Sequence, residues 1–398
     1  ESAFQDCTSL TSIVIPESIT KIEYGAFDGC TSLTSVVVEE GNSVYDSREG
    51  CNAIIETATN KLIRGCNSTI IPSSVTEILG GAFWDCTSLT SIVIPEGVTA
   101  IGYRVFQNCT SLTSVVIPSS VTKIGDKAFR GCTSLKSIEF PQSLTVIDYE
   151  AFKDCSSLTS VVIPSSVTEI IGNAFEGCSS LTSIVVEEGN SVYDSREGCN
   201  AIIETATNKL IQGCNSTIIP SSVTEIGASA FSRCTSLTSI EIPSSVTEIG
   251  ENAFYDCTSL TSIVVEEGNS VYDSREGCNA IIETATNKLI KGSNSTIIPS
   301  SVTAIGYVAF RGCTSLTSIV IPSSVTEIGG SSFWGCTSLT SVEISSSITK
   351  IGSFAFRDCT SLTSIVIPEG VTEIEGSAFY DCTSLTSVVI PSSVTEIG

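Results

Sequence analysis

The sequence predicts a solenoid of stacked repeats, mostly β, curved like a horseshoe and with a parallel sheet along its concave side. The first observation is a phrase that recurs every 23 residues, such as Leu89-Thr-Ser-Ile-Val-Ile-Pro95, which returns at Leu112. The second is that one cysteine marks each copy of the phrase. These thirteen cysteines are Cys7, Cys30, Cys86, Cys109, Cys132, Cys155, Cys178, Cys234, Cys257, Cys313, Cys336, Cys359 and Cys382.

The spacing of these cysteines leaves no residues for a separate domain. Within each group the step is 23 residues, and at three places, such as Cys30 to Cys86, it is 56, which is one repeat plus an insertion of 33. Thirteen repeats and three insertions account for all 398 residues. We therefore expect a single solenoid over residues 1–398, uncapped at both ends, with inserts at about 39–71, 187–219 and 266–298.

The first half of a repeat predicts a short strand. In the first copy Leu10, Ile13 and Ile15 should point into the core, and Val14 should point outward, because strand side chains alternate between the two faces. Pro16 should end the strand, since proline has no N–H to give to a neighbouring strand.

The second half of a repeat predicts the return path, made of short extended or 3₁₀ segments on the convex side. Ile19 and Ile22 should be its inward pair, Ala26 and Phe27 should fill the far corner, and Cys30 should turn the chain back. No single repeat can bury its apolar face alone, so we expect columns of Leu, Ile or Val, Phe and Cys that run through the stack.

The three inserts contain one sequence copied three times. Residues 37–63, 185–211 and 264–290 are identical over 27 positions, which indicates duplication within the gene. In the first copy, residues 52–57 and 61–65 are apolar runs around a polar Thr-Ala-Thr-Asn turn, a pattern typical of a β-hairpin. Each insert should therefore add one further strand to the array and a β-hairpin that projects from it.

The complete repeat reads Leu-x-x-Ile-x-Ile-Pro-x-x-Val-x-x-Ile-Gly-x-x-Ala-Phe-x-x-Cys. This is a leucine-rich-repeat pattern, and its proline and its Ala-Phe-x-x-Cys turn resemble the BspA-type (Treponema pallidum-type) family over the whole chain. The resemblance implies an extracellular or cell-surface protein, secreted by its cell, that works in adhesion. The implied partners are a protein or glycan ligand, such as a host matrix protein.

The charge and the residue composition exclude several classes of function. The chain has 19 Lys and Arg against 43 Asp and Glu, a net charge of −24, which disfavours binding to nucleic acid or to anionic membranes. No apolar run is long enough for membrane insertion. Histidine is absent, so the commonest general base and metal ligand are missing. Every Ser, Glu or Lys candidate recurs as a copy, so we expect no enzyme, no cofactor and no metal.

The central outward position of the predicted strands suggests a binding surface. An apolar stripe flanked by Ser and Thr is larger than a soluble monomer usually exposes, which favours an interaction face. The alternative is that Val is present only because it suits a strand whichever way it points. The valines of this concave stripe are Val14, Val37, Val93, Val116, Val162, Val185, Val264, Val320, Val366 and Val389.

The inserts supply a second set of candidate binding residues. If the hairpins project, their aromatic and basic side chains are available to a partner. These side chains are Tyr45, Arg48, Tyr193, Arg196, Tyr272 and Arg275.

Most cysteines are expected to be buried thiols, because equivalent side chains in stacked repeats point the same way and thirteen cannot pair completely. Cys51 and Cys66 differ, since in a hairpin that turns at Ala58 and Thr59 they would lie opposite each other. A disulfide between them, and between Cys199 and Cys214, is therefore a candidate. In the third copy Ser293 replaces the second cysteine.

The ends of the chain suggest an alternative function. The last residues, 394–398, stop where the first residues, 1–4, would resume the repeat. An open solenoid end exposes apolar residues and strand edges, so head-to-tail self-association into a structural filament or surface-layer scaffold is the alternative to ligand capture. An excised segment of a longer adhesin explains the same ends.

Overall fold

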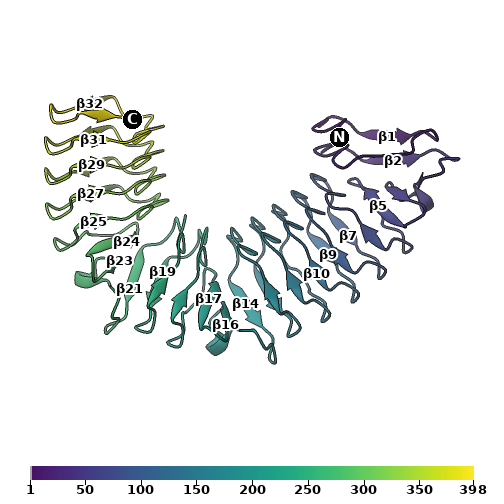
Figure 1. The fold of residues 1–398 in the computed structure, drawn as a ribbon, viewed down its shortest axis with the longest axis horizontal. Coiled ribbons are helices and arrows are strands. Elements are labelled where there is room, and N and C mark those ends of the chain that lie inside the picture. The colour runs from purple at the N-terminus through teal and green to yellow at the C-terminus, as the bar shows by residue number, and fades with distance from the viewer. Residues whose placement is uncertain (1) are drawn as a thin grey trace. The chain divides into compact units, whose positions relative to one another are not determined.

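The computed structural model of the protein describes residues 2–398 in two compact units, Glu1–Ala206 and Thr207–Gly398. Each unit is a β-solenoid, as the sequence predicts, and each turn of about one repeat is called a rung below. Figure 1 shows successive rungs of the first unit, such as those of β7 and β9, side by side. The described residues contain no α-helix.

The first element of most ordinary rungs is a strand of three or four residues, whereas residues 137–140 and the corresponding segments of the insert rungs are extended without being strands. Neighbouring strands are parallel and offset by one repeat, so that Ser12 pairs with Ser35 and Ile13 with Val36. Inward Ile alternates with outward Val, as expected. These long strands are β1 (Ser12–Ile15), β2 (Ser35–Val38), β7 (Ser91–Val93), β9 (Ser114–Val116), β12 (Ser160–Ile163), β14 (Ser183–Val186), β19 (Ser239–Ile242), β21 (Ser262–Val265), β26 (Ser318–Val320), β28 (Ser341–Glu343), β30 (Ser364–Val366) and β32 (Ser387–Val389).

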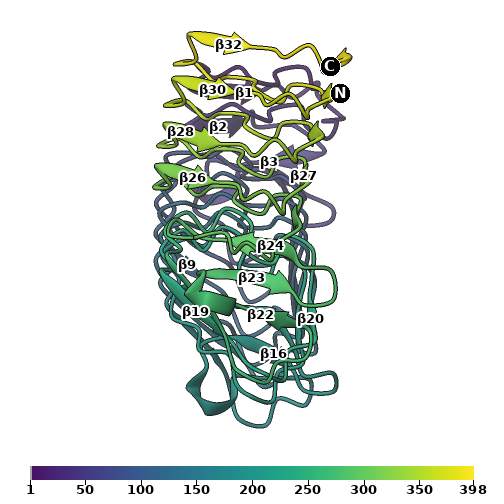
Figure 2. The same cartoon turned by 90° about the vertical axis from the view of Figure 1, so that its left-hand side faces the viewer.

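The return path of each rung is extended and forms a second parallel ladder. Its strands have two residues, an outward one and an inward Ile that is buried in most rungs, and Ile124 pairs with Ile101 and Ile147. Figure 2 shows β26, β28, β30 and β32 on one side of the second unit and β27 on the other. The short strands are β6 (Glu77–Ile78), β8 (Ala100–Ile101), β10 (Lys123–Ile124), β11 (Val146–Ile147), β13 (Glu169–Ile170), β18 (Glu225–Ile226), β20 (Glu248–Ile249), β25 (Ala304–Ile305), β27 (Glu327–Ile328), β29 (Lys350–Ile351), β31 (Glu373–Ile374) and β33 (Glu396–Ile397).

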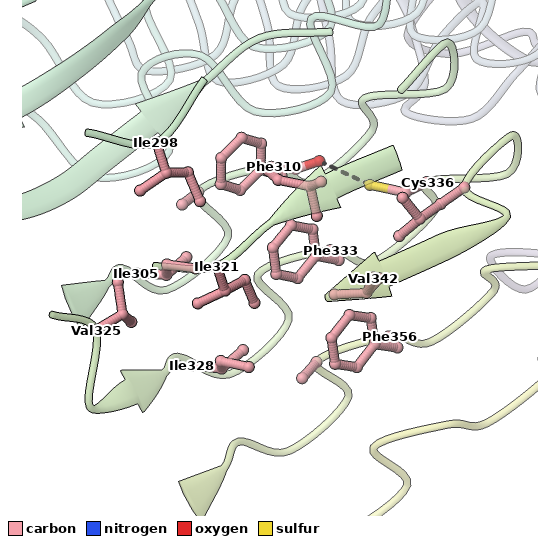
Figure 3. Packing of buried hydrophobic residues seen from close by; sticks show 14 of the residues in the cluster. Ile298, Ile305, Phe310, Ile321, Val325, Ile328, Phe333, Cys336, Val342 and Phe356 are labelled. Atoms are coloured by element: carbon pink, nitrogen blue, oxygen red, sulfur yellow. Dashed lines mark hydrogen bonds between the residues drawn. The ribbon is translucent and has the colours of Figure 1, made fainter. Parts of the chain in front are cut away.

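The core is built of identical side chains stacked along the array. The rings of Phe310 and Phe333 lie 4.9 Å apart, and those of Phe333 and Phe356 lie 5.1 Å apart, with their planes nearly parallel. The thiol of Cys336 donates a hydrogen bond to the carbonyl of Phe310 in the preceding rung (Figure 3). The cysteines therefore link neighbouring rungs as donors as well as filling space.

Each insert adds three strands and a short 3₁₀ turn. In the first copy β3 pairs antiparallel with β4, β4 pairs antiparallel with β5, and β5 joins the short-strand ladder beside β6. The elements are β3 (Tyr45–Asp46), β4 (Ile54–Glu56), β5 (Lys61–Arg64), β15 (Tyr193–Asp194), β16 (Ile202–Glu204), β17 (Lys209–Gln212), β22 (Tyr272–Asp273), β23 (Ala280–Glu283), β24 (Lys288–Gly292), and the turns η1 (Arg48–Gly50), η2 (Arg196–Gly198) and η3 (Arg275–Gly277).

The hairpins are present, but they do not project as predicted. Ile54, Ile55 and Leu62 are fully buried, and Leu62 pairs with Ile78 of the next rung. The apolar run therefore becomes part of the core, because burial of its side chains stabilises the stack far more than exposure would. What reaches outward is the 3₁₀ turn, where Glu49 adopts a left-handed conformation.

The inserts also interrupt the phenylalanine column. Phe4 stacks on Phe27 at 5.5 Å and Phe83 stacks on Phe106 at 5.1 Å, as expected for one column. Between these pairs stands the rung of the insert, whose Gly65 packs on the ring of Phe83 and leaves no room there for a Cβ atom. The phenylalanine column that was expected to run through the stack is therefore interrupted at this insert by a glycine.

The stacked rings predict a large cost for truncation inside a column. Phe106 is fully buried between Phe83 and Phe129, so Phe106→Ala should destabilise the first unit by about 3–5 kcal/mol. The exposed Val116, in the long strand that follows Phe106 in the sequence, is the control, and Val116→Ala should change stability by about 0.5 kcal/mol or less. Urea unfolding followed by circular dichroism measures both, and equal midpoints for the two variants would contradict the stacked core.

Candidate functional site

The largest set of exposed apolar side chains lies on the long strands. All ten predicted stripe valines are exposed, from 42% for Val185 to 76% for Val389. The rungs of the inserts add Ile70, Ile218 and Ile297, which are at least 75% exposed. Each of these side chains is the outward member of an alternating strand or of the equivalent segment of an insert. The structure thus places the predicted valines on the surface of both units, and together with these three isoleucines they are called the Val/Ile stripe below.

The threonines beside the stripe are hydrogen-bonded within the protein. The hydroxyl of Thr34 donates to the carbonyl of Thr11 at 3.2 Å, and that of Thr113 donates to Thr90 at 3.0 Å. The same bond joins Thr340 to Thr317 in the second unit. These threonine hydroxyls are therefore already engaged as donors, whereas the serines two residues before the valines, such as Ser91 and Ser114, share the exposed face of the stripe.

The stripe is hollowed in the second unit where an insert rung meets two ordinary rungs. The hollow has a volume of about 540 Å³ and is lined by Ile218, Val264, Glu241 and Glu266 among others. A hydrogen bond from the N–H of Ser244 lowers the pKa of Glu266, which keeps this carboxylate ionised. Apolar groups and two carboxylates therefore meet in one depression, an arrangement that suits an aliphatic and a basic side chain.

The tyrosines of the inserts lie in the core and not on a surface. Tyr45 is 5% exposed, and its hydroxyl accepts a hydrogen bond from the N–H of Ile22 in the preceding rung. Tyr193 and Tyr272 make the equivalent bonds to Ile170 and Ile249. The tyrosines anchor the inserts to the neighbouring rungs, so we leave them out of the proposed binding surface.

The arginines of the inserts are also engaged within the protein. Arg48 pairs with Asp46 at 2.6 Å and donates to Asn60 at 2.8 Å and to Ser74 at 3.4 Å. The hydrogen bond to Asp46 raises the pKa of Arg48. Arg196 pairs with Asp194 and Arg275 with Asp273 in the same way. Each arginine therefore holds the turn of its insert to the hairpin.

All eighteen cysteines are free thiols in the structure. The register that suggested a bridge between Cys51 and Cys66 does not hold, because a bulge between Ile54 and Ile55 shifts the hairpin by one residue. Cys66 consequently donates to the carbonyl of Asn52, and Cys51 points toward the carbonyl of Ala53. The disulfides Cys51–Cys66 and Cys199–Cys214 remain predictions, but the hairpin register no longer supports them.

Two further findings concern cofactors and membranes. Within residues 2–398, no three His, Cys, Asp or Glu side chains gather as the ligands of a metal ion would. Glu225 and Glu248 stand in register on neighbouring short strands, and Glu225 pairs with Lys209 at 2.6 Å. The part of the chain that the structure describes has no helix with the length and hydropathy of a membrane span.

Comparison with known proteins matches almost the whole chain to one family model, described as the BspA type leucine rich repeat region. Six copies of the model match residues 1–51, 53–182, 202–281 and 282–398. No curated protein matches the sequence.

Two solved structures are similar over most of the chain. One is a leucine rich cell surface protein from Faecalibacterium prausnitzii A2-165, which is 33% identical over 89% of each chain, with a TM-score of 0.56. The other is a leucine-rich repeat protein from Eubacterium ventriosum, 23% identical over 89% of this chain and 96% of that one, with a TM-score of 0.52. The second likeness supports the fold alone.

The burial of the cysteines predicts their reactivity. Cys7 is exposed, whereas sixteen of the other cysteines are buried and Cys382 is partly buried. Ellman's reagent at pH 8 should therefore label one thiol rapidly in the folded protein and all eighteen after denaturation. Cys7→Ser should remove the rapid phase. Rapid labelling of many thiols would show that the stack opens readily, and fewer than eighteen after denaturation would reveal disulfides.

The same burial predicts a loss of stability in alkali. Desolvation raises the pKa of Cys86 and that of Cys257 to about 12, so both keep their protons in the folded chain. The unfolded chain loses these protons near pH 8.5. Their contribution to stability is therefore complete below about pH 8.5 and is lost as the pH rises toward 12. Urea midpoints should fall between pH 8 and pH 9.5, below the titration of tyrosine, and Cys86→Ala should weaken this dependence.

Proposed function

Because the chain belongs to the BspA-type leucine-rich repeat family, we propose that it is a non-enzymatic cell-surface protein that binds a protein partner through the Val/Ile stripe. The observation that carries the proposal is the row of exposed branched aliphatic side chains on the long strands. Exposed apolar area of this extent is a usual mark of a protein interface. The name of the similar Faecalibacterium prausnitzii protein supports the cell surface as the location.

The chemistry of the stripe favours a protein over a glycan. Glycan sites need side chains that donate and accept many hydrogen bonds, and the branched aliphatic side chains that dominate the stripe do neither. A protein surface with its own aliphatic groups would instead remove both apolar faces from water. Adhesion to a host matrix protein is the finer form of this proposal, and head-to-tail self-association is its alternative.

The hollow in the second unit supports a partner with basic side chains. Glu241 and Glu266 lie beside Ile218 and Val264 in this depression, and the chain as a whole carries a net charge of −24. Long-range electrostatic attraction between this negative charge and a basic partner raises the association rate and weakens as the salt concentration rises. We therefore place the centre of the contact in the second unit at this hollow.

Binding to immobilised fibronectin, laminin and collagen tests the proposal. Changing Val93, Val116, Val162 and Val185 to Glu should reduce capture at least about tenfold, because each charge must be desolvated at the interface. The matched control changes Thr99, Thr122, Thr145 and Thr168, which are exposed beside the short strands, to Glu. Surface plasmon resonance measures capture, and circular dichroism verifies folding of both variants.

The outcomes separate the alternatives. Equal loss in both variants would mean that added charge alone prevents capture, and unchanged capture by the stripe variant would move the site off the long strands. Light scattering of the unmodified protein over a wide concentration range tests self-association. Growth into filaments without capture of any matrix protein would favour the scaffold over adhesion.

Within the hollow, Ile218→Glu should weaken binding more than Ile70→Glu, because Ile70 is equally exposed but lies at the first insert, outside this hollow. Glu241→Gln should lower the association rate and reduce its salt dependence. Surface plasmon resonance with the matrix protein that is captured would measure both the affinities and the association rates. Identical losses for Ile218→Glu and Ile70→Glu would remove the hollow from the proposal.

A further inference from the structure

The inserts leave a notch in the array, because their rungs are shorter than the others. In an ordinary rung eight residues lead from the buried Ile of the short strand to the cysteine, as from Ile305 to Cys313. In an insert rung only four residues lead from the buried Leu to the equivalent position, as from Leu289 to Ser293. The Ala-Phe corner is therefore missing, and space opens between the corners of the two neighbouring rungs.

In the first unit this notch is filled by an arginine. Arg64 is 3% exposed and donates to the carbonyls of Gly81 and Trp84, both at 3.1 Å. Its counter-ion is Asp28 of the preceding rung, with a closest N to O distance of 3.6 Å. The remaining cavity beside Arg64 is about 20 Å³. The guanidinium therefore has a counter-ion and two carbonyl acceptors, although its Nε has no hydrogen-bond partner, and the notch is nearly filled.

At the third insert, in the second unit, the equivalent notch is open. The residue in the place of Arg64 is Lys291, and the residue in the place of Asp28 is Tyr255. A cleft of about 180 Å³ remains, lined by Lys291, Tyr255, Tyr307 and Glu251 among others. Two residues that lie outside the copied sequence therefore convert a filled notch into a cleft.

The charge in this cleft is not balanced by the protein. Lys291 is 6% exposed, and the hydrogen bond recorded for its ammonium goes to the carbonyl of Arg311 at 3.4 Å. Within the described residues no carboxylate lies within ion-pair distance of Lys291. Arg311, the other nearby cation, pairs with Asp256 at 3.2 Å. A buried ammonium without an anion is costly, so an anionic ligand would stabilise this arrangement.

The cleft carries a second, opposite charge at its exposed rim. Glu251 is exposed and is not ion-paired with Lys291, although both line the cleft. The buried Oδ1 of Asn252, which also lines it, has no hydrogen-bond partner. A cationic floor, an acidic rim and two tyrosine rings complement a small molecule with a carboxylate at one end and an ammonium at the other.

We propose that this cleft binds a free α-amino acid, with the ligand carboxylate on Lys291, its ammonium group toward Glu251 and an apolar side chain between Tyr255 and Tyr307. The site is independent of the Val/Ile stripe and of the protein partner proposed for it. The first unit has no equivalent site, because Arg64 and Asp28 occupy the notch there.

Isothermal titration of the full chain with L-leucine tests the proposal, with two analogues as matched ligands. Leucinamide lacks the carboxylate, and N-acetyl-leucine lacks the ammonium group. Each should bind at least about tenfold more weakly than leucine, since each loses one charge-assisted contact. Failure of leucine to bind saturably, or equal binding of leucinamide, would overturn the proposal. Tighter binding of galacturonate than of leucine would overturn the assignment to an amino acid.

Variants identify the residues. Lys291→Gln should remove leucine binding and should fold, because the second insert carries Gln212, also buried, at the equivalent position. Lys288→Gln removes an exposed lysine from the same strand β24 and should leave leucine binding unchanged. Tyr255→Asp should abolish binding and raise the melting temperature, because it supplies the counter-ion that Asp28 gives to Arg64. Unchanged binding in Lys291→Gln would overturn the proposal.

Discussion

The in-register contact between equivalent residues one repeat apart determines nearly everything else in each unit. Ile13 pairs with Val36, Phe333 stacks on Phe356, and the thiol of Cys109 donates to the carbonyl of Phe83, all from one rung to the next. A rung has no core of its own, so its apolar residues are buried only by its neighbours. This constraint fixes the inward positions and leaves the outward ones free to vary without a change in the fold.

The inserts satisfy the same constraint by different means. The last strand of each insert, such as β5, joins the ladder of short strands and pairs with a residue 16 positions later, as Leu62 does with Ile78. The hairpin also brings its own apolar strand into the core. Tyr45 and Arg48 then fasten the added chain through hydrogen bonds to the rungs on either side. The inserts therefore extend the array by one shortened rung each, and only the shortening creates new surface features.

The repeat pattern was sufficient to predict the solenoid, the buried positions, the exposed valines and the hairpins. It was not sufficient for features that depend on how the insert rungs fit their neighbours. The bulge between Ile54 and Ile55 moves the cysteines out of register, and Gly65 interrupts the phenylalanine column. The cleft at Lys291 could not be predicted from the insert sequence, because the three inserts are nearly identical and Tyr255, which lines the cleft, belongs to an adjacent ordinary repeat.

The identity of the inserts has a genetic consequence. Residue 37 and residue 185 begin the same 27-residue sequence in the same structural position, 148 residues apart. Recombination between these two copies would delete 148 residues in frame and join residue 36 directly to residue 185. Val36 and Ile184, the residues before the two junctions, are both buried core residues of a long strand. The encoded products would be shorter or longer arrays in which every remaining rung still pairs in register with its neighbour. A population of cells could therefore vary the length of this protein without altering its fold.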